Sequence, residues 1–176
     1  MAAFGQCYNR GVPVFETHGL DLITHNPAQT RQFGARLGRA LRAGDVICLA
    51  GELGAGKTTL ASGIGEGWGA REVVNSPTFV FVNEYGNAGG GKLYHVDAYR
   101  LRDATDAESI ALPELLSEVN EGQSAILIEW PERVADQLPP QRLWIDLVWV
   151  EESARRIQVT ASGTRYEVLI ENLRKM

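Results

Sequence analysis

A glycine-rich stretch in the first third of the chain has the residue types and the spacing of a phosphate-binding loop. Residues 51–58 read GELGAGKT and fit the pattern G-x-x-x-x-G-K-[ST]. Glycines lack a Cβ atom, so the backbone can curl its N–H groups around an anion. Lys57 can reach the β- and γ-phosphates of a nucleotide, and the Thr58 hydroxyl can bind magnesium. Together these residues predict a nucleotide site that recognises phosphate.

The segments on either side of this loop have the character that such a loop requires. Residues 45–50 form a short apolar run of strand type, and residues 58–68 can continue as a helix that stops near Gly69. The start of that helix adds unpaired N–H groups and the positive end of its dipole. A glycine-rich turn could match the pattern by chance, yet the flanking strand and helix make chance a poorer explanation.

Two carboxylates, Asp97 and Glu129, end the apolar runs LYHVD and AILIE. A phosphate loop needs a second element that bears a carboxylate, because Mg2+ and the attacking water must both be placed opposite Thr58. Burying an acid at the end of an apolar run is costly unless it has a partner, so a functional role is plausible for both. The alternative is that either acid caps the next helix or pairs with an arginine, and Arg100 and Arg102 are close to Asp97.

Three further residues are weaker candidates. Thr78, in the stretch SPT, could belong to a loop that senses the γ-phosphate, or to a plain turn that enters a strand. His95 lacks a third ligand at metal-site spacing, which favours a structural histidine or a partner for Asp97 over a metal ligand. Trp130 follows Glu129 and could be core, a neighbour of the nucleotide or a protein contact, with core as the default.

Composition and charge limit the class of protein. The chain has 176 residues, of which 44% are hydrophobic and 22% charged, as is ordinary for one soluble globular domain. Its net charge is −5 and it has no basic block, so any nucleic acid is expected to be held by a partner. Cys7 and Cys48 are too few for a disulfide framework. A cytoplasmic location is expected, since no signal peptide and no run of about 20 apolar residues is present.

The remaining segments alternate between strand-like and helix-like patterns. A helix is expected to begin with Asn26 as its N-cap and Pro27 in its first turn, and a glycine-rich connector is expected to join the two strands of a hairpin. Strands are predicted at residues 12–22, 79–85, 92–97, 125–130, 143–149 and 156–160, and helices at 101–120, with an interruption at Pro113, and 166–173. We therefore expect one α/β domain over residues 1–176, a three-layer fold with a mixed central sheet and helices on both faces, and with residues 1–11 as a possible flexible extension.

Absent motifs narrow the chemistry further. The chain has no Asn-Lys-x-Asp element to read guanine, no G-x-S-x-G or Cys/His nucleophile arrangement, and no arginine-rich lid after the loop. Adenine nucleotide is favoured by default. An ATP hydrolase, a small-molecule kinase and a nucleotide-gated binding module with negligible turnover all remain compatible with these residues.

Four motifs, taken in order along the chain, resemble those of a known protein family. GELGAGKTT at residues 51–59, SPTF at 76–79, HVDAYRL at 95–101 and IEW at 128–130 resemble the TsaE (YjeE) family of bacterial P-loop ATPases. The similarity covers roughly residues 20 to 173. Ser62, where the family commonly has arginine, and Pro113, in place of a more usual Leu-Gly segment, depart from the family pattern outside the motifs.

This resemblance implies a magnesium-dependent ATPase, which we expect to be slow in isolation. It would act with TsaD and TsaB proteins to form threonylcarbamoyladenosine (t6A) at position 37 of tRNAs that read codons beginning with adenine, and it would reach tRNA only through these partners. Lys57 and Glu129 would be catalytic, and Thr58, Asp97 and Glu129 would bind Mg2+. The implied ATP-binding residues are Gly51, Glu52, Leu53, Gly54, Ala55, Gly56, Lys57, Thr58, Thr59, Thr78 and Trp130.

Overall fold

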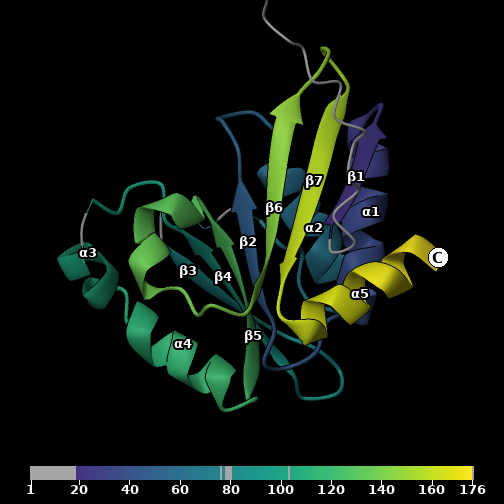
Figure 1. Ribbon diagram of the computed structural model, residues 1–176. Helices are drawn as coiled ribbons and strands as arrows, with labels where there is room; N and C mark the ends of the chain where they lie inside the picture. Colours follow the sequence, from purple (N-terminus) through teal and green to yellow (C-terminus); the bar gives the residue numbers. More distant parts are fainter. Residues whose placement is uncertain (1–18, 76, 78–80, 103, 176) are drawn as a thin grey trace, which may run out of the picture.

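The structure is a computed structural model that describes residues 19–75, 77, 81–102 and 104–175. A seven-stranded sheet runs through the molecule in the order β1-β7-β6-β2-β5-β4-β3 (Figure 1). Its strands are β1 (Gly19–Thr24), β2 (Val46–Ala50), β3 (Val82–Gly86), β4 (Lys92–Asp97), β5 (Ser124–Glu129), β6 (Arg142–Trp149) and β7 (Arg155–Ser162). The predicted strand 12–22 lies mostly outside the described residues.

The sheet is mixed, as expected. Strand β2 pairs in parallel with both β5 and β6, and β4 pairs in parallel with β5. The pairs β3–β4, β6–β7 and β1–β7 are antiparallel, which confirms the predicted hairpin between β3 and β4. All five residues of β2 are buried, because the strand has neighbours on both edges and packed layers on both faces.

Helices cover both faces of the sheet (Figure 1). One core cluster joins the sheet to α1 (Pro27–Ala40), α2 (Lys57–Trp68) and α5 (Thr164–Lys175). A second cluster lies on the opposite face, under α3 (Ala104–Ser109), α4 (Leu112–Asn120) and the 3-10 helix η1 (Pro131–Gln137). Ile47 and Leu49 of β2 enter the first cluster, whereas Val46 and Cys48 enter the second. The predicted three-layer α/β architecture is therefore confirmed.

Helix α1 begins as its sequence predicts. The Asn26 side chain accepts a hydrogen bond from the Gln29 backbone N–H at 2.9 Å, and Pro27 stands in the first turn. The helix ends at Ala40. A carboxylate accounts for the tight connection to β2, because Asp45 accepts from the Arg42 N–H at 2.9 Å and pairs with Arg165 at 2.6 Å.

The predicted helix over residues 101–120 is two helices. Helix α3 ends at Ser109, and Pro113 lies in the first turn of α4, so the break precedes the proline instead of falling on it. Ala111 at this break has a left-handed backbone, with a φ of 57°.

Among the described residues, no helix is long and apolar enough to cross a lipid bilayer.

Helices α1 and α2 approach each other closely through glycines on their facing sides. A Cβ atom at Gly38 of α1 would lie 2.0 Å from the Ile64 backbone oxygen, and one at Gly63 of α2 would lie 2.1 Å from the Arg31 backbone oxygen. No real Cβ tolerates such distances, so any side chain at these positions would force the helices apart. The close packing ties the helix that follows the phosphate loop to its neighbour.

We therefore expect Gly38→Ala to destabilise the protein, although the same change in an open helix is stabilising. Overpacking at this contact should lower the free energy of unfolding by about 1–3 kcal/mol. Gly86→Ala is the matched control, since no atom lies within 4 Å of a Cβ there. Urea unfolding of both variants measures the difference, and a Gly38→Ala protein as stable as the control would contradict the close contact.

Candidate nucleotide site

The phosphate loop connects β2 to α2 and rests on the neighbouring strand β6. Gly51 has a φ of 140°, and a Cβ atom there would lie 2.4 Å from the Leu147 backbone oxygen. Gly56 is the N-cap of α2 and has a φ of 103°, a value that side-chain-bearing residues rarely adopt. The strand, loop and helix predicted from the sequence are all present, so the first N–H groups of α2 are presented at the loop.

Lys57 lies inside the loop and is buried. Its Nζ atom donates to the Gly51 carbonyl oxygen at 2.7 Å and to the Glu52 carbonyl oxygen at 2.9 Å. The same ammonium lies 3.8 Å from the centre of the Trp130 ring, within range of a cation–π contact. Burial lowers the pKa of Lys57, while the negative charges of Glu129, Glu132 and Asp97 act to raise it.

The two strand-end carboxylates are brought together by the strand order. Asp97 of β4 and Glu129 of β5 are paired in the parallel register, so both stand at the carboxyl edge of the sheet. Both residues are buried, and both line a cavity of about 400 Å³ beside the loop. The cavity is lined by Leu53, Gly54, Gly56, Lys57, Thr58, Thr59, Asp97, Tyr99, Glu129 and Trp130.

Most of the residues proposed from the sequence therefore line one cavity. The others lie elsewhere in the loop or outside the described residues. Gly51, Glu52 and Ala55 belong to the loop but do not line the cavity, and Ala55 is fully buried in the core. Thr78, proposed as a sensor of the γ-phosphate, lies outside the described residues. Asp97 accepts a hydrogen bond from the Tyr99 backbone N–H at 3.0 Å, so it also caps the turn that follows β4.

Two aromatic residues, Tyr99 and Trp130, line the cavity. Trp130 has a left-handed backbone with a φ of 59°, so β5 ends at Glu129 and the predicted strand is one residue too long. Its ring packs against Tyr99 at a centroid distance of 4.9 Å. Tyr99 was not proposed as a site residue from the sequence. The available signal was its position two residues after Asp97 in the motif HVDAYRL. Trp130 is only partly buried, so it is a neighbour of the cavity as well as a packing residue.

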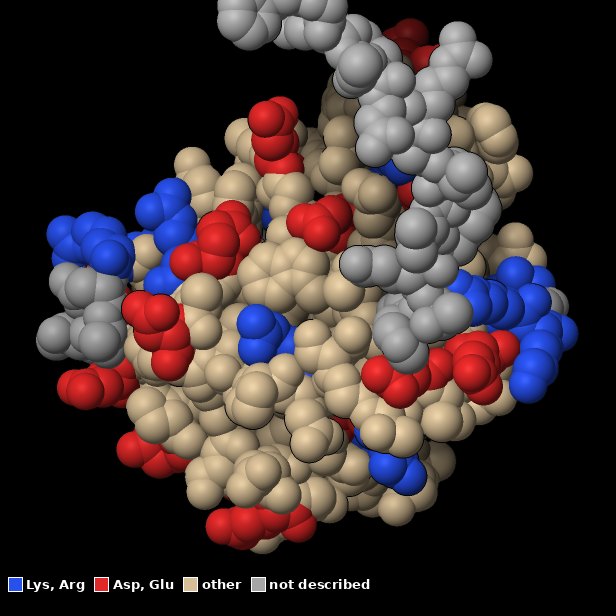
Figure 2. Space-filling model, in the orientation of Figure 1, with Lys and Arg blue, Asp and Glu red and all other residues tan. Residues whose placement is uncertain are grey.

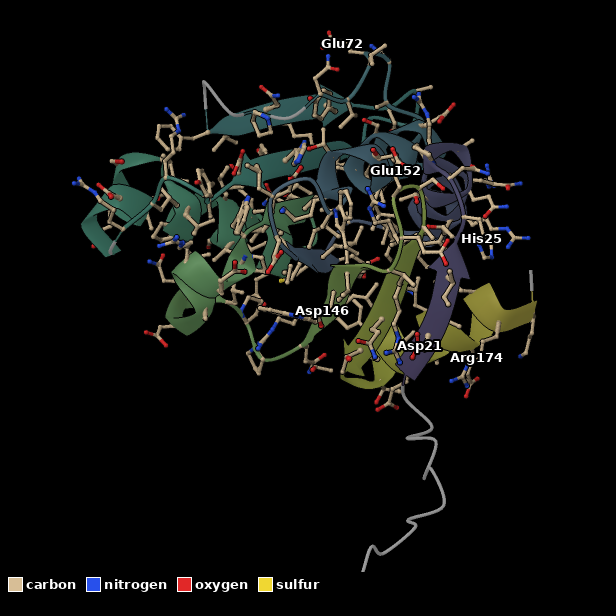
Figure 3. All side chains as sticks on the ribbon, turned by 90° about the horizontal axis from the view of Figure 1, so that it is seen from above. Asp21, His25, Glu72, Asp146, Glu152 and Arg174 are labelled. Atoms are coloured by element: carbon tan, nitrogen blue, oxygen red, sulfur yellow. The ribbon has the colours of Figure 1, made fainter. Side chains whose placement is uncertain are left out.

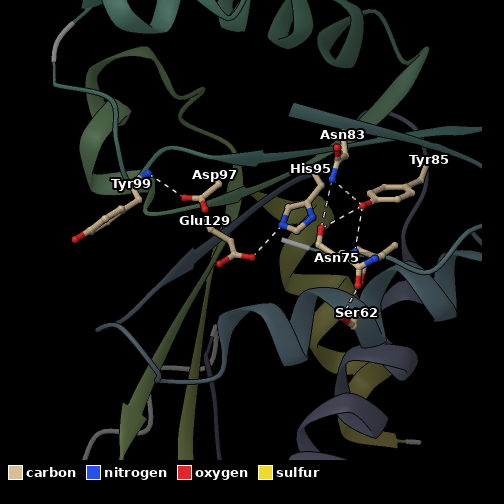
Figure 4. Close-up of polar contacts among 9 residues, drawn as sticks. Ser62, Asn75, Asn83, Tyr85, His95, Asp97, Tyr99 and Glu129 are labelled. Atoms are coloured by element: carbon tan, nitrogen blue, oxygen red, sulfur yellow. Dashed lines mark hydrogen bonds and ion pairs between the residues drawn. The ribbon is translucent and has the colours of Figure 1, made fainter. Parts of the chain in front are cut away.

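Glu129 is oriented by a buried histidine (Figure 4). The Nε2 atom of His95 lies 3.0 Å from Oε1 of Glu129, and the histidine is fully buried. Its Nδ1 atom has no hydrogen-bond partner among the described residues. A carboxylate oxygen can only accept, so Nε2 of His95 is the donor in this contact. The partner that the structure shows for His95 is Glu129, whereas the sequence had suggested a structural histidine or a partner for Asp97.

A hydrogen-bond network holds the segment that precedes residues 76–80 (Figure 4). The Ser62 hydroxyl of α2 donates to the Val74 carbonyl oxygen at 2.8 Å. The Tyr85 hydroxyl accepts from the Asn75 N–H and donates to the Asn75 carbonyl oxygen, both at 3.2 Å. Ser62, the first departure from the family pattern, therefore ties this segment to the phosphate-loop helix.

Comparison with known proteins identifies the family. A model of the family described as "Threonylcarbamoyl adenosine biosynthesis protein TsaE" matches residues 24–157. The chain belongs to the TsaE family. A relative from Bacillus subtilis (strain 168), named tRNA threonylcarbamoyladenosine biosynthesis protein TsaE, is 41% identical over 150 residues, which cover 85% of this chain and 90% of the relative. One of the same name from Streptomyces coelicolor is 41% identical over 141 residues, which cover 77% and 93%.

A solved structure agrees with the architecture. The crystal structure of Bacillus subtilis YdiB superimposes with a TM-score of 0.72 at 36% identity, and the match covers 89% of this chain and 95% of that one. The resemblance drawn from the four motifs is confirmed, and so is the α/β fold. Cys48, in the strand before the loop, is free and buried. Burial raises the pKa of its thiol to about 12, so the thiol stays protonated and packs as a core residue.

Proposed function

We propose that this protein binds ATP with Mg2+ at the cavity beside the phosphate loop, and that it hydrolyses ATP in support of t6A formation on tRNA. The observation that carries the proposal is the pairing of two buried carboxylates, Asp97 and Glu129, beside Lys57 in one cavity. Phosphoryl transfer needs these parts together, namely an anion cradle, a fixed cation and acids at the reacting end of the nucleotide. The pathway is taken from the names of the relatives.

The loop would bind the phosphates through its backbone N–H groups and Lys57. The Lys57 ammonium donates to two loop carbonyls, and a phosphate oxygen is a stronger acceptor because it carries a full negative charge. Trp130 lies against the same ammonium and limits the directions that it can take. Lys57 would thus turn toward the β- and γ-phosphates at little cost.

The donor set of the cavity fits Mg2+. The Thr58 hydroxyl and the carboxylates of Asp97 and Glu129 are hard oxygen donors, which this cation prefers. No group of three or more His, Cys, Asp or Glu side chains in the described part of the chain could hold a metal ion unaided, so phosphate oxygens and water would complete the shell. When bound, Mg2+ would offset the negative charge of the phosphates.

Glu129 would act on the attacking water. Its Oε1 atom accepts from the ring of His95, which leaves Oε2 as the oxygen able to take a proton from water. The buried histidine holds the carboxylate in one orientation, and a positioned base needs that constraint to act efficiently. Asp97, one strand away, would serve the metal.

We expect Asp97→Asn to weaken the dependence of nucleotide binding on Mg2+. The amide keeps the size of the side chain and its acceptor for the Tyr99 N–H, but it loses the negative charge that attracts the cation. The stimulation of ATP affinity by Mg2+ should fall by about tenfold, corresponding to one charged contact. Titrations with and without Mg2+ measure it, with Asp106→Asn in an exposed ion pair as control. Equal stimulation in both variants would remove Asp97 from the metal site.

Coupling to tRNA would pass through TsaD-like and TsaB-like proteins in the cytoplasm. The net charge of −5 disfavours direct binding of a polyanion. On the face shown in Figure 2, the Lys and Arg side chains of the described residues form separate groups among acidic ones. A slow rate in isolation and a changed rate with partners follow if docking completes the arrangement around the cavity.

The test is to measure ATP consumed and free phosphate released, with and without these partners and tRNA. An ATP hydrolase releases one phosphate for each ATP consumed, and its rate responds to the partners. A small-molecule kinase would consume ATP without matching free phosphate. A nucleotide-gated binding module would bind ATP tightly and release no phosphate even with the partners present.

A further inference from the structure

The phosphate loop also contacts the hairpin formed by β6 and β7, which contributes no residue to the lining of the cavity. The turn between β6 and β7 lies against the loop, and Glu152 of this turn is labelled in Figure 3. The Arg155 guanidinium donates from Nε to the Ala55 carbonyl oxygen at 3.1 Å and from Nη2 to the Gly54 carbonyl oxygen at 3.4 Å. The Trp149 indole N–H donates to the same Gly54 oxygen at 3.0 Å.

The guanidinium is itself fixed on its own turn. Its Nη1 atom donates to the carbonyl oxygens of Glu151, Glu152 and Ala154 at 3.2, 3.3 and 2.9 Å. Its carbon lies 4.3 Å from the centre of the Trp149 ring, a stacking contact that an arginine makes well. Arg155 therefore connects its own turn to two consecutive carbonyls of the phosphate loop.

Holding these carbonyls fixes the two peptides to which they belong, and the N–H of the first, at Ala55, donates to the Glu52 carbonyl oxygen at 3.1 Å. In a planar trans peptide the C=O and N–H bonds point in opposite directions. Because Arg155 binds the Ala55 carbonyl, the N–H of Gly56 in the same peptide points away from Arg155, and Gly56 lines the cavity. The positive charge of Arg155 also adds to the field that the start of α2 presents to an anion.

We propose that Arg155 and Trp149 are positioning residues that order the phosphate loop before a nucleotide binds. This inference rests on the proposed function, because it assigns the loop to phosphate. Neither side chain lines the cavity, so both act through the loop backbone and not on the nucleotide. Without them the loop would have to be ordered during binding, and that entropy would be subtracted from the affinity.

Matched variants on the same two strands test the proposal. Arg155→Lys keeps the charge but loses the planar fork that reaches both the loop and the turn, and Trp149→Phe keeps the ring but loses the N–H. Arg156→Lys, in an exposed pair with Asp21, and Trp144→Phe, whose indole binds Asp146, are the controls.

Two measurements are made on each folded protein, namely the Kd for MgADP and the hydrogen exchange of the loop amides in the absence of nucleotide. Arg155→Lys should raise the Kd about tenfold to a hundredfold, as for hydrogen bonds from a charged donor, and Trp149→Phe about fivefold. Both should speed exchange at Ala55, the loop amide that is hydrogen-bonded without nucleotide, while the controls stay within about twofold of wild type.

A purely structural role predicts a different pattern. Arg155→Lys would then lower the Tm, but the folded protein would bind MgADP as tightly as Arg156→Lys does and would exchange its loop amides at the same rate, which would overturn the proposal. If wild type bound no MgADP, the proposed function would fail instead. The exchange measurement in the nucleotide-free protein would then decide by itself whether Arg155 orders the loop.

Discussion

Replacing Lys57 with alanine should remove ATP binding from an otherwise folded protein. Lys57 is the only lysine or arginine that lines the cavity in the described part of the chain, so its loss leaves the β- and γ-phosphates without a charged donor. We expect the Kd for MgATP to rise by about a hundredfold or more, as for the loss of charge-assisted hydrogen bonds to phosphate. Isothermal titration of the purified variant measures the change.

The control for this variant is Lys92→Ala. Lys92 forms an exposed pair with Glu84 at 3.4 Å, so its removal should alter neither binding nor folding appreciably. Circular dichroism and thermal unfolding establish that both variants are folded. An unchanged affinity for MgATP in folded Lys57→Ala would show that the loop does not bind phosphate through this residue.

The Glu129→Gln variant should bind ATP and yet fail to hydrolyse it. The amide keeps an oxygen that can accept from His95 Nε2, so the buried contact survives. It cannot take a proton from water and has no negative charge, so phosphate release should fall by about a hundredfold to ten-thousandfold, the range for a lost general base. Steady-state phosphate release and MgATP titration separate the two effects.

Glu132→Gln is the matched control, because Glu132 is exposed on the following 3-10 helix. It should hydrolyse ATP at nearly the wild-type rate. If Glu129→Gln did the same, then Glu129 would be only a structural partner of His95, and the base would have to be sought elsewhere in the cavity.

The local parts of the site were predictable from the sequence because their signals are local. The phosphate loop is one uninterrupted pattern, and a buried strand such as AILIE shows its burial in its composition. The N-cap of α1 and the hairpin of β3 and β4 are likewise set by neighbouring residues. Asp97 and Glu129 could be proposed separately for the same reason.

The relation between distant segments could not be read from such patterns. That β4 and β5 are parallel neighbours, which places Asp97 beside Glu129, depends on strand order. The contact of Arg155 with the loop joins residues 100 positions apart, and nothing in the local sequence marks it. Glycine is a weak helix former, and the reason for the glycines of α1 and α2 is evident only once the two helices are seen in contact.

The central claim is that ATP hydrolysis by this protein supports t6A formation. It is tested most directly by supplying purified TsaD-like and TsaB-like proteins with tRNA, ATP and the other substrates of the modification, and by measuring t6A and released phosphate together. Wild type, Glu129→Gln and Glu132→Gln are compared with a reaction that lacks this protein. We expect t6A and phosphate with wild type and Glu132→Gln, and little of either with Glu129→Gln or without the protein. Equal yields of t6A in all four reactions would contradict this claim.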